Sequence, residues 1–385
     1  MNEMYNQIDG QELIRIRRAL HKIPELGYQE FQTGKFIADY LREVGIAVSE
    51  NVAKTGLIGL IQAPNATKTL LLRADMDALE LNEENSLDYK SQNSGMMHAC
   101  GHDVHMAILL GAAKFLMENK DRLKINIKLM FQPGEEGFGG ALPMINEGVL
   151  ENPRVDAALA FHVMPDSEVG SLLLTKGTVT ASPDNFDIII KGRGGHGAMP
   201  EKNIDSIHIG AQIACKLKSL VKDYIHTVQP AVVSVCSFNG GTNHNVMPDT
   251  TVLKGTFRSF DEDTRQKLAI LIEETAKDIA DTYGADCSVI FDFLYPSVIN
   301  DDSMLQKMAD IAKDTVEVIW TDIPQTWGED FSYISQAVPS CMALLGCGNQ
   351  KKGITAPLHS SNFAVDEACI PLGVKIMTDF ALKFD

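Results

Sequence analysis

The spacing of apolar residues in the N-terminal half of the chain switches repeatedly between a helical and an extended pattern. Helical stretches carry apolar residues at every third or fourth position, whereas extended stretches are short apolar runs. The predicted helices cover 11–20, 31–44 and 104–117, and the predicted strands cover 56–61, 69–72, 125–131 and 155–161. Strands that alternate with helices favour an α/β domain with a mostly parallel sheet.

A different order of elements occupies the middle of the chain. Its predicted elements are a strand at 186–190, a helix at 206–221, strands at 231–237 and 251–257, a helix at 262–283 and a strand at 288–293. The order β-α-β-β-α-β is that of a ferredoxin-like unit, which can fold by itself. A helical pattern returns at 303–316, and an apolar run follows at 341–345. We therefore expect a discontinuous α/β domain, residues 1–182 and 295–385, interrupted by an inserted domain, residues 183–294.

Composition and charge disfavour several classes of protein. The 385 residues include 34 basic and 51 acidic side chains, so the formal net charge of −17 argues against nucleic-acid binding. No stretch approaches the roughly 20 apolar residues that span a bilayer. Seven cysteines at scattered spacings predict reduced thiols, and the polar N-terminal segment lacks the apolar core of a signal peptide. These features predict a cytoplasmic protein without a membrane or nucleic-acid partner.

Polar side chains follow three of the predicted strands. Asp75 and Asp77 come after the first of these strands. Glu135 and Glu136 come after the second, and His162 comes after the third. Because the carboxyl ends of strands in an open α/β sheet converge on one crevice, we expect these side chains to meet in space.

The segment 98–103 (HACGHD) is the densest group of potential metal ligands. Cys100 and His102 can face the same ion, and a thiolate with an imidazole suits zinc, nickel, cobalt or manganese. A buried cysteine with a helix-capping Asp103 is the interpretation that needs no metal. His162, His359 and the pair of glutamates favour the metal interpretation. Beside a metal, one glutamate of the pair can bind the ion and the other can take a proton from bound water.

Motifs along nearly the whole chain resemble those of the M20 metallopeptidase family, in its aminoacylase and hippurate-hydrolase branch. They are 73–79 (RADMDAL), 98–105 (HACGHDVH), 132–137 (QPGEEG), 194–198 (GGHGA), 245–248 (NVMP), 328–331 (GEDF) and 357–359 (PLH). The cysteine within HACGHD is specific to this branch, because other M20 branches lack that ligand. The resemblance implies a zinc-peptidase-like α/β catalytic domain whose inserted ferredoxin-like domain acts as a lid or dimerisation domain.

The resemblance also implies a role for each matching residue in the catalytic domain. Glu135 matches the general base. Asp75, Asp77 and Asp103 are expected to orient the ligands. His98 and His105 flank the metal motif without matching ligand positions. The expected ligands of two divalent ions (Zn, Mn, Ni or Co) are Cys100, His102, Glu136, His162 and His359.

Three residues of the inserted domain match positions that act on substrate. His196 resembles the histidine that stabilises the tetrahedral oxyanion, and it is expected to act across the interface of a homodimer or higher homo-oligomer. Asn245 and Arg258 match substrate-holding positions, and the Arg258 guanidinium is a candidate partner for the amino-acid carboxylate. Glu80 and Glu201 depart from the family pattern, and both would disfavour acidic groups near the cleft.

The implied activity is hydrolysis of the amide bond of a small N-acyl amino acid, such as an N-acetyl or N-benzoyl derivative, by a metal-activated water. A dipeptidase or carboxypeptidase on the same fold is one alternative. A catalytically silent binding protein is another, although it has no physical reason to keep both the base and five ligands. A cysteine hydrolase with Cys100 as nucleophile and His102 as its partner is a third, and insensitivity to chelators would identify it.

Overall fold

The computed structural model describes residues 9–137, 139–225 and 231–384, which form two compact units. Unit 1 comprises Met1–Val179, Val298–Asp322 and Asp330–Asp385, and unit 2 comprises Thr180–Ser297 and Ile323–Glu329. The range expected for the inserted domain, 183–294, falls within unit 2. The first eight residues, which entered the expectation about a signal peptide, lie outside the described residues. In the described part of the chain, no helix is long and apolar enough to cross a bilayer.

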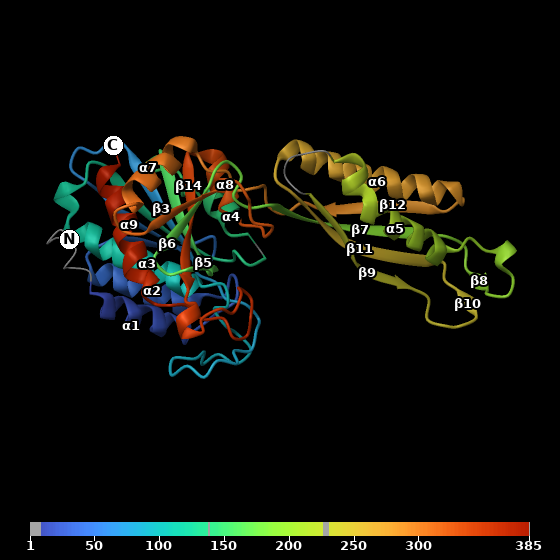
Figure 1. The fold of residues 1–385 in the computed structure, drawn as a ribbon, viewed down its shortest axis with the longest axis horizontal. Helices are drawn as coiled ribbons and strands as arrows, with labels where there is room; N and C mark the ends of the chain where they lie inside the picture. Colours follow the sequence, from blue (N-terminus) through green and yellow to red (C-terminus); the bar gives the residue numbers. More distant parts are fainter. Residues whose placement is uncertain (1–8, 138, 226–230, 385) are drawn as a thin grey trace. The chain divides into compact units, whose positions relative to one another are not determined.

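Unit 1 is built on one eight-stranded sheet with the strand order β1-β2-β4-β3-β5-β14-β6-β13 (Figure 1). Its central strands β4, β3, β5 and β14 are parallel, as predicted. The sheet as a whole is mixed, because β1 and β2 pair antiparallel with each other, as do β2 with β4 and β14 with β6. The strands are β1 (Ala47–Val52), β2 (Gly56–Ile61), β3 (Thr69–Asp75), β4 (Asn126–Gln132), β5 (Ala157–Glu168), β6 (Ser171–Thr175), β13 (Glu317–Thr321) and β14 (Ser340–Gly348).

Helices cover both faces of this sheet, and alternate side chains of each strand pack against them. Leu70 and Leu72 of β3 belong to the core shared with α1, α2, α3, α7 and α9. Leu71 points the other way, into the core shared with α4 and α8. The helices are α1 (Gly10–His21), α2 (Phe31–Glu43), α3 (His102–Glu118), α4 (Ala141–Asn146), α7 (Asp302–Ala312), α8 (Ser332–Ala337) and α9 (Cys369–Lys383).

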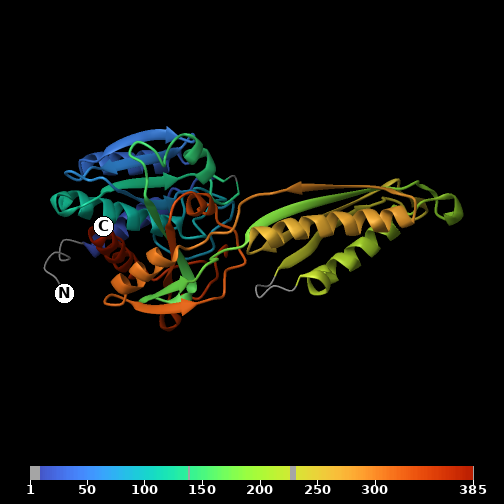
Figure 2. The ribbon, with the colours of Figure 1, turned by 90° about the horizontal axis from the view of Figure 1, so that it is seen from above.

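Unit 2 has the ferredoxin-like topology that the order of elements predicts. Its four-stranded sheet has the order β12-β7-β11-β9, and each neighbouring pair is antiparallel. Helices α5 and α6 pack on one face and supply its core together with the sheet (Figure 2). A short two-stranded ribbon, β8 with β10, extends the unit. The elements are β7 (Ser182–Lys191), β8 (Gly195–His196), α5 (Ser206–Tyr224), β9 (Val232–Gly240), β10 (Val246–Met247), β11 (Thr250–Ser259), α6 (Glu262–Thr282) and β12 (Asp286–Asp292).

Candidate metal centre

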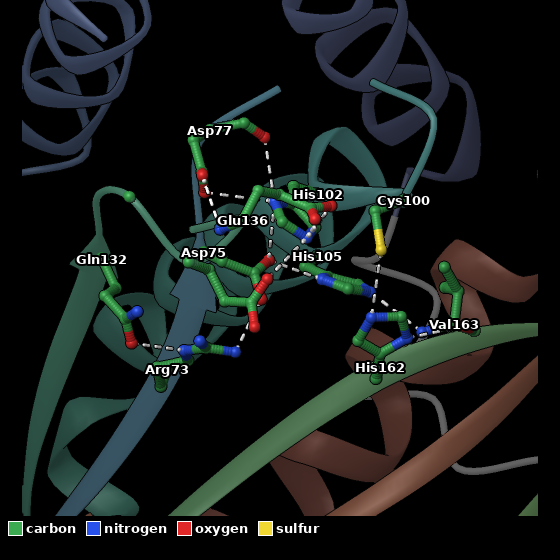
Figure 3. Close-up of polar contacts among 12 residues, drawn as sticks. Arg73, Asp75, Asp77, Cys100, His102, His105, Gln132, Glu136, His162 and Val163 are labelled. Atoms are coloured by element: carbon green, nitrogen blue, oxygen red, sulfur yellow. Dashed lines mark hydrogen bonds and ion pairs between the residues drawn. The ribbon is translucent and has the colours of Figure 1, made fainter. Parts of the chain in front are cut away.

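The five predicted metal ligands converge at one place in unit 1, although four separate segments supply them. Figure 3 shows four of them, Cys100, His102, Glu136 and His162. The ligand atoms of Cys100, His102 and His162 lie within 4.8 Å of one another, and all three residues are buried. The ligand atoms of Cys100, Glu136 and His359 form a second group of the same size. Because Cys100 belongs to both groups, the five residues make one continuous set that is large enough for two ions.

The distances within this set leave room for ions between the side chains. Cys100 Sγ lies 3.5 Å from His162 Nε2. Glu136 Oε1 lies 3.8 Å from His102 Nε2 and 3.3 Å from His359 Nε2. A thiolate, three imidazoles and a carboxylate are donors that zinc and neighbouring divalent metals accept.

Unsatisfied polar atoms indicate that this set fits a metal. His102 Nε2 is buried and has no hydrogen-bond partner among the described residues, and the buried Glu136 Oε1 has only its ion pairs with His102 and His359 there. A buried polar atom without a partner costs about 1–3 kcal/mol, which a coordinated ion would offset. His102 Nδ1 donates to Asp77 O at 2.9 Å, and His162 Nδ1 donates to Val163 O at 2.8 Å. In the neutral rings these bonds place the proton on Nδ1, so that both Nε2 lone pairs can face the site.

The backbone between the first two ligands requires a glycine. Gly101 separates Cys100 from His102 and has a φ of +86°, which lies in the left-handed region. A Cβ at this position would also lie 2.3 Å from Cγ2 of Val163. Gly101 therefore lets the chain turn sharply, so that the thiol and the imidazole can face the same point.

His359 has an unusual backbone for a ligand. Its φ of +61° lies in the left-handed region, which is uncommon for residues other than glycine. Its amide donates to Ala99 O at 2.9 Å, which fixes the loop against the segment that carries Cys100. Its side chain is 54 % exposed, so it forms the open side of the centre.

Two of the three aspartates expected to orient ligands do contact them or their neighbours. Asp77 accepts the Glu136 amide at 2.9 Å through Oδ2 and, through its carbonyl, the proton of His102 Nδ1. Asp75 accepts His105 Nδ1 at 2.6 Å and pairs with Arg73 at 2.6 Å. Both arrangements hold an imidazole of helix α3 in a fixed orientation.

Asp103 has a different environment from the other two aspartates. The prediction that it caps α3 is wrong, because the residue before the helix is Gly101 and no side chain caps it. Asp103 instead lies inside the first turn, where it pairs with Arg17 at 2.6 Å and with His21 at 2.8 Å. It therefore fastens α3 to α1 and makes no contact with a ligand.

The site is strongly negative and retains protons on two of its ligands. Burial raises the pKa of the Cys100 thiol, and the carboxylates of Glu136 and Glu135 raise it further. Burial lowers the pKa of His102, but Asp75 and the hydrogen bond to Asp77 outweigh this effect and raise it to about 10. A metal must displace these protons when it binds. A raised thiol pKa also opposes the thiolate that a cysteine hydrolase would need.

Glu135 lies beside the ligands without being one of the five. Its Oε2 is 4.0 Å from His102 Nε2, and the side chain is buried. The adjacent Glu136 points to the same centre, so the two carboxylates share one site. This position suits a group that accepts a proton from water held among the ligands.

His196 and Asn245 lie together in the ribbon of unit 2. His196 pairs with Val246, and the Gly197 amide donates to Asn245 O at 2.9 Å. The exposed His196 ring accepts the Ala198 amide at Nδ1, at 3.1 Å. In the neutral ring the proton is therefore on Nε2, which is the donor that an oxyanion requires.

Arg258 lies at the opposite end of the same unit. It is the last residue but one of β11, whereas the ribbon extends the sheet beyond Thr250, at the start of that strand (Figure 1). Eight residues at about 3.3 Å each separate Thr250 from Arg258 by roughly 26 Å. In a single copy of unit 2, Arg258 thus lies too far from His196 to contact the same small molecule.

His105, for which the sequence predicts a supporting or structural role beside the ligands, lies next to two of them. Besides its bond to Asp75, its Nε2 accepts the Val163 amide at 2.9 Å, next to His162. Its ring stacks on His102 with centroids 5.5 Å apart. His105 thereby connects the environments of two ligands. The sequence indicates this placement, because His105 follows His102 by three residues and therefore lies on the same side of α3.

The chain is similar to characterised proteins along most of its length. The sequence profile described as peptidase family M20/M25/M40 matches residues 71–383. Thermostable carboxypeptidase 1 of Saccharolobus solfataricus is 40 % identical over 376 residues, 97 % of this chain and 95 % of the relative. N-acyl-L-amino acid amidohydrolase of Geobacillus stearothermophilus is 40 % identical over 292 residues, 76 % of this chain and 78 % of the relative. The crystal structure of a dinuclear metal-binding M20 peptidase of Bacillus subtilis has a TM-score of 0.86 at 32 % identity and covers 97 % of both chains.

Proposed function

The chain belongs to peptidase family M20/M25/M40, and we propose on this basis that it is a metal-dependent amidohydrolase that removes the acyl group from N-acyl amino acids. The observation that carries the proposal is the buried five-ligand set with Glu135 at its side. A panel of N-acyl amino acids, incubated with metal-loaded protein and assayed with ninhydrin for released amine, tests it. No amine from any substrate, at confirmed metal occupancy, would refute it.

The residues present account for each proton movement of such a hydrolysis. Divalent ions held by the five residues would make a water more acidic and polarise the amide carbonyl. Glu135 is placed to accept the proton of the water whose oxygen adds to the carbonyl carbon. Glu135 then returns the proton to the leaving nitrogen, which departs as the amine of the free amino acid. The His196 Nε2–H stabilises the developing oxyanion, and a donor of this kind contributes on the order of 3 kcal/mol.

The identity of the two ions is proposed from the donor types. Cys100 and three histidines favour Zn, Mn, Ni or Co over the hard ions Mg and Ca. Metal analysis of the purified protein, followed by chelation and re-addition of each metal, identifies the ion that restores activity.

A carboxypeptidase activity is the second candidate, because a relative with 40 % identity carries that name. A carboxypeptidase substrate also ends in a free carboxylate, so the same centre could serve both reactions. The two activities differ in the acyl side, which is a short acyl group in one case and a peptide in the other. Relative kcat/KM for an N-acetyl amino acid and for a tripeptide with the same C-terminal residue decides between them.

Arg258 is proposed to bind the carboxylate of the amino-acid part. The hydrogen bonds it makes within the described chain all start from Nη1, towards Thr256 Oγ1, Phe257 O and Asp184 O. Nη2 and Nε therefore remain available for a bidentate carboxylate. Burial lowers the pKa of Arg258, which is the environment of a partly desolvated guanidinium.

We expect Arg258→Ala to discriminate between free acids and amides. Loss of a charge-assisted pair should lower kcat/KM for N-acyl amino acids by roughly 10- to 100-fold, because such bonds contribute about 1.5–3 kcal/mol. The corresponding carboxamides, which lack the charge, should be affected much less. Steady-state kinetics on matched acid and amide substrates measures this. Equal losses on both would assign Arg258 a structural role.

His196 is proposed to act in the active site of a second subunit. Thr250 and Arg258 are roughly 26 Å apart along β11, and His196 lies beyond Thr250. One copy of unit 2 therefore cannot present both Arg258 and His196 to one small substrate. Two copies can do so if one supplies Arg258 and the other supplies His196 to the same site. A closed symmetric dimer would form two equivalent composite sites in this way.

We expect two inactive variants, His196→Ala and Glu135→Gln, to restore activity when their subunits are mixed. A heterodimer would contain one site with an intact His196 and an intact Glu135. Random exchange makes half of the dimers heterodimers, so activity should reach up to roughly a quarter of the wild-type value. The assay follows amine release after mixing, with subunit exchange verified by mass labelling. Verified exchange without recovery would place His196 in the site of its own subunit.

A further inference from the structure

Glu30 is a buried carboxylate that the proposed reaction does not use directly. Its side chain is 0 % exposed, and its Oε1 accepts the amide of Gly134 at 2.9 Å. Gly134 directly precedes Glu135 in the segment 132–137, which we call the glutamate turn. We propose that Glu30 is a positioning residue. It holds the glutamate turn so that the Glu135 carboxylate points at the water from which it accepts a proton. This inference rests on the proposed role of Glu135 as general base.

Capping of helix α2 would be a simpler role for Glu30, but Glu25 caps that helix. Glu30 is the residue before α2, a position from which a side-chain oxygen can cap the first helical amides. Its carboxylate makes no such bond. Glu25 accepts the amides of Gln32 at 3.2 Å and Thr33 at 2.9 Å in its place. The carboxylate of Glu30 is thus directed away from its own helix and towards the glutamate turn.

Both oxygens of Glu30 are fixed, which makes it a rigid support. Oε2 accepts the Thr55 hydroxyl at 2.6 Å, while Oε1 holds Gly134. Thr55 is itself buried at the turn before β2. A side chain that is held at both oxygens cannot change rotamer without breaking a buried hydrogen bond, and the cost of an unsatisfied buried group opposes that change.

A neighbouring side chain supports the same part of the turn from the same segment. The Tyr28 hydroxyl donates to Gly139 O at 3.1 Å. A Cβ on Gly134 would lie 3.1 Å from the Tyr28 ring, so the ring closes the space beside that residue. Gly134 also has a φ of +64°, which is the conformation that glycine adopts readily. The residues just before α2 therefore determine the path of the chain into Glu135.

The two glutamates of the turn are held by different carboxylates. Asp77 accepts the amide of Glu136, the expected ligand, at 2.9 Å. Glu30 accepts the amide that precedes Glu135, the expected base. Removing Glu30 should therefore disturb proton transfer while the anchor of the metal ligand stays intact. This separation distinguishes a positioning role from a general contribution to folding.

The test compares Glu30→Leu with Glu25→Leu, because both remove a buried carboxylate from the same segment. We expect Glu30→Leu to lower kcat by roughly 10- to 100-fold, the size of effect that a displacement of about 1 Å can produce. KM and the metal content should stay near the wild-type values. Glu25→Leu should lower the melting temperature through the loss of its bonds to α2, with kcat unchanged.

Two further measurements separate positioning from stability. Hydrogen exchange of metal-free protein should be faster in the glutamate turn of Glu30→Leu, and unchanged there in Glu25→Leu. Glu30→Gln should recover most of kcat, because its amide oxygen still accepts the Gly134 amide while the Thr55 hydroxyl rotates to accept from the new NH2 group. If Glu30→Leu does not fold, Glu30→Asp replaces it, since its shorter side chain draws the acceptor away from Gly134.

The outcomes that overturn the inference differ from those that overturn the proposed function. A wild-type kcat in folded, metal-loaded Glu30→Leu or Glu30→Asp refutes the positioning role. Equal kcat losses in the Glu25 and Glu30 variants also refute it. If Glu135→Gln itself retains full activity, the base has been misassigned and the proposed function fails first. An inactive Glu135→Gln beside a fully active Glu30→Leu overturns only the inference.

Discussion

Glu135→Gln is expected to lower kcat by roughly 10²–10⁴-fold while the protein still binds two metal ions. The amide of glutamine has nearly the shape of the carboxylate but cannot accept a proton at neutral pH. Glu135 lies beside the ligand set, and it is not needed to complete the group of Cys100, Glu136 and His359. The chemical step should therefore fail in a site whose metal binding is preserved.

The measurement combines metal analysis with single-turnover kinetics. Glu136→Gln is the matched control, because it makes the same change one residue later, at an expected ligand. That control should lose metal together with activity, in contrast to Glu135→Gln. An unchanged rate in Glu135→Gln would remove Glu135 from the mechanism. Loss of metal from both variants would mean that the two glutamates share the ligand role.

Cys100→Ala is expected to lose metal and activity together. The thiol belongs to both groups of ligand atoms, so its removal opens the site of each ion. Only a thiolate binds these metals well, and burial with the nearby carboxylates holds the pKa of Cys100 high. Every ion bound must therefore displace protons, and metal affinity should fall as the pH is lowered.

Metal titrations of wild-type protein and variant across a range of pH test this expectation. Cys347→Ala is the control, because Cys347 is also buried and burial also raises its pKa, but it lies in β14 outside the ligand set. The control should keep its metal and its activity. Full metal occupancy in Cys100→Ala would exclude Cys100 as a ligand. An affinity independent of pH would show that no proton is displaced.

The sequence predicted most elements that have one polar face or one clear period. Helix α6 is an example, whereas the almost fully buried strands β3 and β4 were predicted from short apolar runs. Helix α9 was missed, and Pro371 and Gly373 near its start are residues that disfavour a helix. Strand β1 was missed for the opposite reason, since most of its side chains are exposed and polar. The order of strands in the sheet depends on pairings that no local pattern contains.

The part of the candidate site that could be predicted consists of residue types that are rare in the sequence. Cysteine, histidine and paired glutamates near strand ends favour a metal centre, and the resemblance to the M20 family implied the five ligands. Glu30 escaped because its partner, Gly134, is a backbone amide 104 residues away. The distance between His196 and Arg258 was equally hidden, because it follows from the register of β7 and β11 and not from the motifs. Contacts made by backbone groups cannot be predicted from the pattern of side chains along the sequence.

The left-handed backbone of His359 limits how this protein can diverge. Among residues other than glycine, asparagine and aspartate tolerate that conformation best. Aspartate is the only one of these three that offers an anionic ligand, and oxygen ligands favour harder ions such as manganese or magnesium. Aspartate at this position would therefore replace a neutral imidazole by a charged oxygen ligand and shift the preference of the centre towards harder ions.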